Sequence, residues 1–287
     1  MMRNLVVQHA RSPGRARRAT RIGLLAVLSW LVAGPARASC GLDLCPAMGS
    51  ELESGVSVTE QTRYTRVVDS QTWYLQNFLG VQVLHQQSFR LGALLPVVSL
   101  FDEDGGRHGL GSSVVFGQWM GPVPLGSVGG GMQVELPTSS HPELGDRHVL
   151  LLPYGVLHRT LGSGWATSRI GLGQVLGSAG EHHHGDETSI VDPHGHTELK
   201  GRLDVGGTAV ASLGVSGLVD GRWALGHHGG TEVALGAAVG LARQRAGGQL
   251  WVLVPVTPDP SHELRVGLTL EGWVRAVAVE PFEHDHP

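Results

Sequence analysis

Hydrophobic and polar residues alternate along much of the chain, which is the period of a β-strand with two different faces. Between Leu264 and Leu270, every even position holds leucine or valine, while Arg265, Gly267 and Thr269 stand between them. The same alternation runs from Thr208 to Trp223 and from residue 233 to 241. These segments predict strands that bury one face in an apolar environment and turn the other face to a polar one.

Further strands are predicted where alternation or a short apolar run is bounded by turn residues. They lie at 55–67, 73–85, 89–100, 111–119, 129–136, 149–158, 165–175, 198–205 and 249–256. Turn residues separate them, as in the Asp-Glu-Asp-Gly-Gly segment at 102–106 and the Pro-Asp-Pro segment at 258–260. The total is about ten to twelve strands.

Composition supports an all-β fold. The chain has 43 glycines and 15 prolines, and these residues cost about 1 and about 3 kcal/mol relative to alanine inside a helix. Antiparallel strands with alternately short and long connections are typical of a transmembrane β-barrel, in which every backbone polar group is paired and no edge stays open. A soluble periplasmic β-sandwich is the alternative, since one buried face produces the same alternation.

Aromatic residues are only 5% of the chain, which is few for a barrel with aromatic girdles at both membrane interfaces. Several nevertheless stand near the ends of predicted strands, and we expect these to mark the interfaces: Trp73, Tyr74, Trp119, Trp165, Trp251 and Trp273.

The N-terminus resembles a secretory signal peptide. Six arginines and no acidic residue precede the apolar run from Ile22 to Val32, and the small residues of Ala36-Arg37-Ala38 follow. The predicted cleavage therefore falls before Ser39, and the run is too short to span a bilayer as a helix. We expect the mature chain to comprise an N-terminal stub at 39–54, a barrel domain at 55–278 and a tail rich in histidine and acidic residues at 279–287.

Removal of residues 1–38 takes away seven of the 21 basic residues and no acidic residue, so that 14 basic residues remain against 25 acidic ones. An acidic chain argues against nucleic acid as a partner. The expected partners are outer-membrane lipid and a small-molecule solute.

The only two cysteines, Cys40 and Cys45, lie close together at the predicted mature N-terminus. In an oxidising compartment such a pair most often forms a disulfide. A redox or metal role would need further ligands or an activated thiolate, for which the sequence gives no indication.

The segment from Gly129 to Gly164 resembles the outer-membrane transporter family of the phenol-degradation meta-pathway. The resemblance rests on a strand ending in Leu136-Pro137-Thr138, a glycine-containing loop, and a next strand that carries Pro153. It implies a barrel akin to the long-chain fatty-acid transporters, which passes small hydrophobic or aromatic compounds without an energy source. The C-terminal tail departs from that family, whose chains end on an aromatic strand residue.

Histidine is abundant, with 16 residues, and two of its groups share the segment between residues 177 and 197. Imidazole and carboxylate groups at such spacings suit zinc, copper or nickel. The candidate metal ligands are His182, His183, His184, Asp186, His194 and His196. Solvated loop histidines with only adventitious metal affinity are the simpler interpretation.

No catalytic motif is evident, because the serines between glycines do not stand at a strand-to-helix turn and the glycine-rich stretches lack a following lysine. We therefore expect a protein without enzymatic activity and without a required cofactor. The predicted function is passive transport of a small, hydrophobic or aromatic compound across the outer membrane. The alternative is a divalent-metal-binding cell-envelope protein, in the outer membrane or the periplasm.

Overall fold

Twelve antiparallel strands form one sheet that closes on itself. The structure, a computed structural model, describes residues 37–38, 48–49, 54–68, 71–85, 88–145, 148–176, 197–210, 213–225, 231–242, 246–257 and 262–275. The barrel strands are β3 (Gly55–Val67), β4 (Trp73–His85), β5 (Phe89–Asp102), β7 (Ser113–Val123), β8 (Gly126–Leu136), β9 (Val149–Leu161), β10 (Gly164–Leu176), β11 (Thr197–Val210), β12 (Leu213–Ala224), β13 (Thr231–Ala242), β14 (Ala246–Pro255) and β15 (His262–Arg275).

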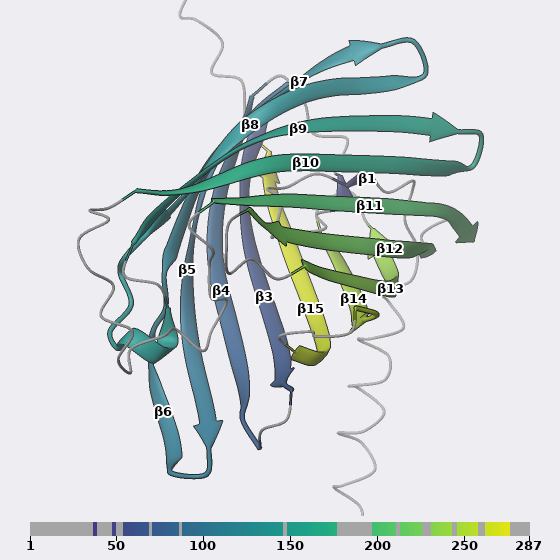
Figure 1. Cartoon of the computed structure of the whole chain (residues 1–287). Coiled ribbons are helices and arrows are strands. Elements are labelled where there is room, and N and C mark those ends of the chain that lie inside the picture. The colour runs from purple at the N-terminus through teal and green to yellow at the C-terminus, as the bar shows by residue number, and fades with distance from the viewer. Residues whose placement is uncertain are drawn as a thin grey trace, which may run out of the picture. The chain divides into compact units, whose positions relative to one another are not determined.

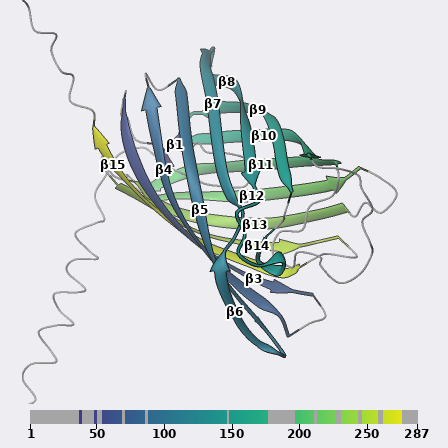
Figure 2. The ribbon, with the colours of Figure 1, turned by 90° about the vertical axis from the view of Figure 1, so that its left-hand side faces the viewer.

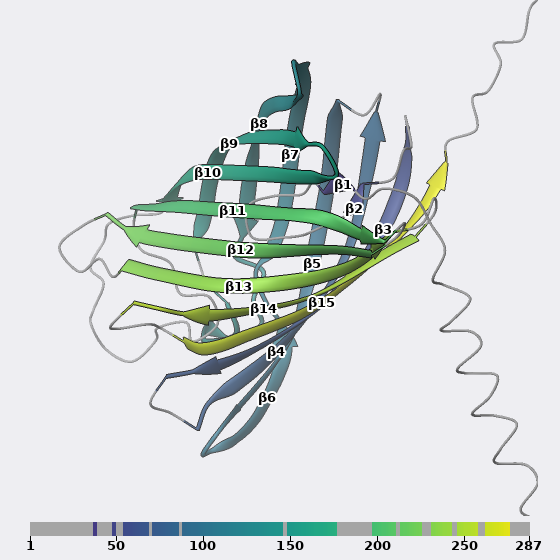
Figure 3. The same ribbon diagram turned by 90° about the vertical axis from the view of Figure 1, so that its right-hand side faces the viewer.

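Closure is made by the last strand, β15, which pairs along its length with the first barrel strand, β3. Figure 1 shows these two strands side by side, and the views in Figures 2 and 3 follow the sheet around from β5 to β14. All neighbours are antiparallel, and all pairs except β15–β3 and β5–β7 are consecutive in the chain. The predicted transmembrane barrel is therefore confirmed, and the β-sandwich alternative is wrong because the sheet has no second layer to pack against.

One hairpin extends beyond the rest of the barrel. Strand β6 (Gly105–Leu110) pairs with the end of β5 from Val97 to Asp102, while β7 pairs with the beginning of β5 from Phe89 to Leu94. The chain turns tightly at Gly105, whose φ of 127° is a conformation that glycine adopts without steric cost. The resulting β5–β6 hairpin projects past the neighbouring strands in all three ribbon views (Figures 1 to 3).

The connections differ between the two ends of the barrel. Short turns join β4 to β5, β7 to β8 and β9 to β10, and the start of β3 and the end of β15 lie at that same end. Long connections, such as those from Leu136 to Val149 and from Leu176 to Thr197, lie at the other end. In outer-membrane barrels the short turns face the periplasm and the long loops face outward, which assigns the β5–β6 hairpin to the extracellular end.

The outer face carries an apolar band. Its large exposed side chains include Val81, Leu91, Ile170, Leu203, Leu235, Val252 and Leu268. In a soluble protein such a continuous apolar surface would be a liability, whereas a bilayer requires it. Within the described residues, no helix has the length and hydrophobicity needed to cross a membrane. The only helical element described is the 3-10 turn η1 (Pro142–Leu144).

Aromatic side chains mark both ends of this band. Trp73 stacks on Phe101 with ring centroids 4.1 Å apart, and Tyr64 lies 5.7 Å from Trp73, at the extracellular end. Phe89 and Trp119 are register partners near the periplasmic end. They form the interfacial girdles that the sequence predicted.

Not every tryptophan belongs to a girdle. Tyr74, Trp251 and Trp273 are at most 5% exposed and stand at inward-facing positions of their strands. Trp165 shares the inward face of β10 with Arg169. The expectation that these four mark the membrane interfaces is wrong, because proximity to a strand end does not determine which face a side chain takes.

A second correction concerns the segment predicted as one strand from Thr208 to Trp223. The structure ends β11 at Val210 and begins β12 at Leu213, so a tight turn separates two antiparallel strands.

Outside the barrel, β1 (Arg37–Ala38) pairs antiparallel with β2 (Met48–Gly49). Cleavage after Ala38, as predicted, would remove β1.

Candidate functional site

Polar side chains fill the inner face of the barrel. Along each strand, every second residue turns inward, and most of the buried polar residues stand at these positions. They are Ser57, Gln61, Arg63, Thr65, Gln76, Gln82, Arg90, Gln118, Gln133, Thr167, Arg169, Glu198, Lys200, Arg202, Asp204, Ser216, Gln249, Thr269 and Glu271. The inner face is therefore largely polar, as in membrane β-barrels. Ser216, Thr269 and Glu271, at polar positions of the alternating segments, are among the residues that face inward.

Basic residues concentrate on three neighbouring strands. Arg169 on β10 is the direct register partner of Arg202 on β11, and Lys200 on β11 is the partner of Arg222 on β12. This group of four, Arg169, Lys200, Arg202 and Arg222, is called the basic wall below. Glu198 neutralises part of it, with Lys200 Nζ 3.1 Å from Oε1 and Arg222 Nε 2.7 Å from Oε2.

Apolar residues form a cluster on the inner face of β4, β5 and β7, beside polar residues of the same strands such as Gln82 and Gln118. These strands lie across the ring of strands from β10–β12. Phe78, Leu94, Val114 and Phe116 form one buried cluster there. We call these four residues the apolar wall. Because burial of aromatic and aliphatic surface is favourable for any apolar compound that displaces water, this wall offers a surface to a hydrophobic or aromatic solute.

Two further arginines lie on aromatic rings. The guanidinium carbon of Arg63 is 5.1 Å from the centroid of Phe78, and that of Arg90 is 5.8 Å from the ring of Trp273. Glu271 faces Arg90 and accepts hydrogen bonds from Ser57 Oγ at 2.9 Å and from Gln82 Nε2. Their side of the lumen is thus both charged and aromatic, with the cations held over ring faces.

A short segment packs on the inner face at the extracellular end. Leu144 of η1 has no exposed surface and packs against Tyr74, Val98 and Leu100, which all face inward. Arg107 on β6 lies 3.4 Å from Glu143 of the same turn. The β8–β9 connection therefore folds over the inner face of the β5–β6 hairpin, and nothing in the alternation of hydrophobic residues predicted this inward fold.

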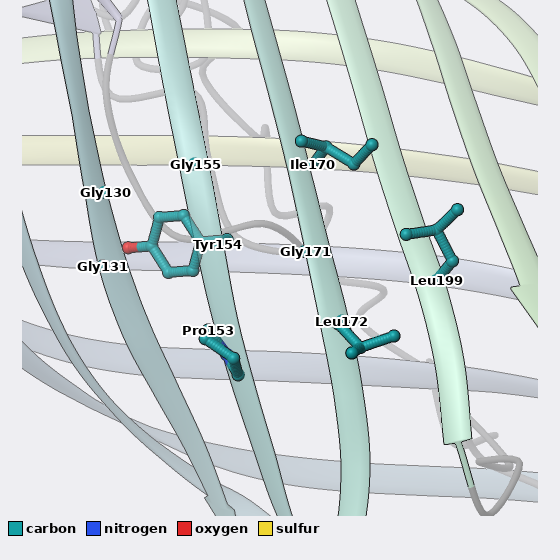
Figure 4. Close-up of a pocket in the computed structure, with 9 residues that line it drawn as sticks. All are labelled: Gly130, Gly131, Pro153, Tyr154, Gly155, Ile170, Gly171, Leu172 and Leu199. Carbon is teal, nitrogen blue, oxygen red and sulfur yellow. The ribbon is translucent and has the colours of Figure 1, made fainter.

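One groove lies on the outer wall of the barrel. It is shallow, floored by glycines of β8, β9 and β10, and bordered by Pro153, Ile170, Leu172 and Leu199 (Figure 4). Ile170 and Leu172 are exposed outward-facing residues of the lipid band. The groove is thus bordered by residues of the lipid band.

The residues singled out from sequence as a disulfide and as a metal site lie outside the described residues. This holds for Cys40 and Cys45 and for all six candidate ligands, His182, His183, His184, Asp186, His194 and His196. In the part of the chain that the structure describes, no group of three or more histidine, cysteine or acidic side chains is arranged to hold a metal ion. The disulfide and the metal site stay predictions, as does the signal peptide.

The fold has solved relatives. No family model matches the sequence, and no curated protein matches it. The COG4313 outer membrane channel from Pseudomonas putida F1 superposes with a TM-score of 0.61 at 11% identity, covering 80% of this chain and 100% of that one. The translocator domain of the autotransporter NalP from Neisseria meningitidis gives 0.51 at 12% identity, covering 91% and 97%.

A closed barrel with an apolar outer band, aromatic residues at both ends of that band and a polar interior is suited to a membrane, and the first of these neighbours is described as an outer membrane channel. The chain has the fold of an outer-membrane β-barrel. At these identities the likeness concerns the fold, so the phenol-degradation family suggested by the β8–β9 hairpin is supported only to the level of an outer-membrane barrel.

Proposed function

We propose that the barrel is a passive channel for a small compound with a hydrophobic or aromatic skeleton. The observation that carries this proposal is the apolar wall of Phe78, Leu94, Val114 and Phe116 on the inner face, which lies across the ring of strands from the basic wall. A purely polar lumen would favour sugars and ions, whereas an apolar wall lowers the free energy of a partly hydrophobic solute inside the channel.

Two other observations support the proposal. The β8–β9 hairpin, on which the resemblance to the phenol-degradation transporters rests, forms as a hairpin, with Leu136 at the end of β8. The structural neighbours are described as a channel and a translocator domain, which agrees with our expectation of a protein without enzymatic activity.

Liposome swelling tests the proposal. Purified full-length protein is reconstituted, and the swelling rate is compared for benzyl alcohol and for a sugar of similar size. The rate for benzyl alcohol is corrected for its diffusion through protein-free vesicles. We expect the protein to admit both solutes and to favour the aromatic one.

A variant pair isolates the apolar wall. Phe116→Ser removes an inward ring that is 4% exposed, and Val115→Ser changes the neighbouring residue, which faces lipid and is 38% exposed. Because one aromatic contact contributes about 0.5–1.5 kcal/mol, Phe116→Ser should lower the ratio of aromatic to sugar flux about two- to tenfold, and Val115→Ser should leave it unchanged. An unchanged ratio in both variants would refute the role of the apolar wall, and absence of any protein-dependent swelling would refute the channel.

A further inference from the structure

Two buried arginines stand directly opposite each other in the lumen. Arg169 on β10 and Arg202 on β11 are register partners and are 4% and 7% exposed. Like charges at directly opposed positions of neighbouring strands repel, and this arrangement destabilises a sheet unless an opposite charge lies between them. The pair therefore calls for an anion.

The carboxylates near the pair, Asp204 and Asp220, leave several of its hydrogen-bond donors unused. Nε of Arg169, and both Nε and Nη2 of Arg202, are buried without a hydrogen-bond partner among the described residues. Leaving a buried donor unpaired is unfavourable, and more so when the group is charged. This contrasts with Arg222 of the same wall, whose Nε donates to Glu198.

The charged groups around the pair restrict what it can bind. Lys200 stands two residues from Arg202 on the same face but is held by Glu198, and Arg90 and Tyr154 interact electrostatically with Arg169. Two carboxylates oppose an anion: Asp204, which attracts Arg169 and has an oxygen without a hydrogen-bond partner, and Asp220, the register partner of Arg202. A singly charged ligand is favoured over a doubly charged one, because each additional negative charge is repelled by both aspartates.

The surroundings of the pair are partly apolar. Val156, the register partner of Arg169 on β9, is buried and packs with Leu152 and Tyr154. An inward face that combines two unpaired guanidinium groups with aliphatic and aromatic neighbours matches a carboxylate joined to an apolar skeleton. Arginine is well suited to that headgroup because its planar fork donates two hydrogen bonds to a carboxylate.

We infer that Arg169 and Arg202 form a binding site for the carboxylate of a small, singly charged organic acid on its way through the lumen. The inference deepens the proposed function and rests on it, since it names the headgroup of the transported compound. The site lies on β10 and β11, away from the apolar wall on β4, β5 and β7.

Current through single channels in planar bilayers provides the test, with benzoate as the probe and benzyl alcohol and sulfate as comparison solutes. Benzoate should reduce the wild-type chloride current in a saturable manner, while neutral benzyl alcohol should not and sulfate should do so more weakly. In a KCl gradient the wild-type reversal potential should indicate preference for the anion.

The double variant Arg169→Gln with Arg202→Gln should raise the dissociation constant for benzoate block at least about tenfold, because each lost charge-assisted hydrogen bond contributes about 1.5–3 kcal/mol. Arg63→Gln is the matched control for the single variant Arg169→Gln: each removes one positive charge from a buried inward position, and Arg63→Gln should change block much less. Equal effects of these two single variants would show that only the total lumen charge matters, which overturns the site.

Two further measurements distinguish failure of the carboxylate site from misfolding and from failure of the channel proposal. Folding of each variant is checked by its heat-dependent shift in gel mobility, and the single variant Arg169→Lys, which keeps the charge but loses the fork, should bind benzoate with intermediate affinity. If wild-type protein conducts no ions, the channel proposal fails, and calorimetric titration of the detergent-solubilised barrel with benzoate still decides the site. If the protein conducts but benzoate neither blocks nor binds, only the carboxylate site fails.

Discussion

Arg222 on β12 donates a hydrogen bond from Nε to Oε2 of Glu198 on β11 over 2.7 Å, and the other oxygen of Glu198 lies 3.1 Å from Nζ of Lys200. Glu198 has no exposed surface. One carboxylate thus compensates two cations in the basic wall, whereas Arg169 and Arg202 are the members that keep buried nitrogen atoms without a hydrogen-bond partner. The division separates a structural part of the wall from a part that is available to a solute.

Glu198→Gln should destabilise the barrel. The change leaves Lys200 and Arg222 without a counter-charge in a largely buried position, and breaking a buried ion pair from one side costs up to about 3–5 kcal/mol. Arg222 is 22% exposed, so water in the lumen should reduce the cost. The measurement is the urea concentration at the midpoint of unfolding in detergent, with gel mobility as the readout.

The control for this prediction is Glu263→Gln, which removes the partner of Arg66 at 2.9 Å in a pair whose side chains are 56% and 44% exposed. An exposed pair contributes only about 0–1 kcal/mol, so the midpoint should hardly move. Similar shifts for the two variants would mean that the buried carboxylate contributes no more to stability than the exposed one.

Glu60→Leu should stabilise the barrel in lipid. Glu60 is exposed on the outer face of β3, and its register partners are the lipid-facing Leu79 and Leu270. Charged residues on the lipid face of a barrel are destabilising, by about 2–4 kcal/mol for arginine or lysine at mid-membrane and by less for glutamate. The gain should appear as a higher urea midpoint in phospholipid vesicles. Glu103→Leu, in the exposed turn between β5 and β6, serves as the comparison and should give no gain; a gain from both would indicate a general effect of lost negative charge.

Alternation alone was sufficient to place most of the barrel. Strands β3 and β4 begin and end at the predicted residues, because each has apolar residues on one face and is bounded by turn residues. The limit of the method is visible at Val210 and Leu213, where one predicted strand is in fact two. Only Ala211 and Ser212 stand between these residues, and a single serine among the turn-forming residues is a weak signal for a turn.

The lumen site was less accessible to prediction. The alternation in 198–205 places Lys200 and Arg202 on one face together with Glu198 and Asp204, which is the signal that sequence reasoning passed over. That Arg169 stands opposite Arg202 depends on the register between β10 and β11. A long connection separates these strands, and register is not determined by local sequence in such a case.

Gly267→Ala should destabilise the barrel, whereas Gly272→Ala on the same strand should not. A Cβ at Gly267 would lie 2.3 Å from the ring of Trp251 on β14, while a Cβ at Gly272 would have no atom within 4 Å. Overpacking of a buried site costs about 1–3 kcal/mol, and the two substitutions are otherwise identical. The temperature of the heat-dependent mobility shift reports the difference; equal temperatures would show that Trp251 moves aside freely.

Leu144→Ser should increase the conductance of the channel. Leu144 holds η1 against Tyr74, Val98 and Leu100 on the inner face of the barrel, and truncating a buried leucine to a small residue costs about 2–5 kcal/mol. That amount exceeds the contribution of the half-exposed pair of Arg107 with Glu143, so the serine variant should release the turn from the inner face. Single-channel current in symmetric KCl is the measurement.

The matched control is Leu110→Ser on the β5–β6 hairpin, where the side chain is 40% exposed and points away from the lumen. It should leave the current unchanged. A Cβ added at Gly109 would clash with Ser140, and one added at Gly111 would lie 3.1 Å from the backbone oxygen of Leu144, so the chain of this segment packs closely on both glycines. Equal currents in wild type and Leu144→Ser would indicate that this close backbone packing, and not the leucine side chain, holds the turn in place.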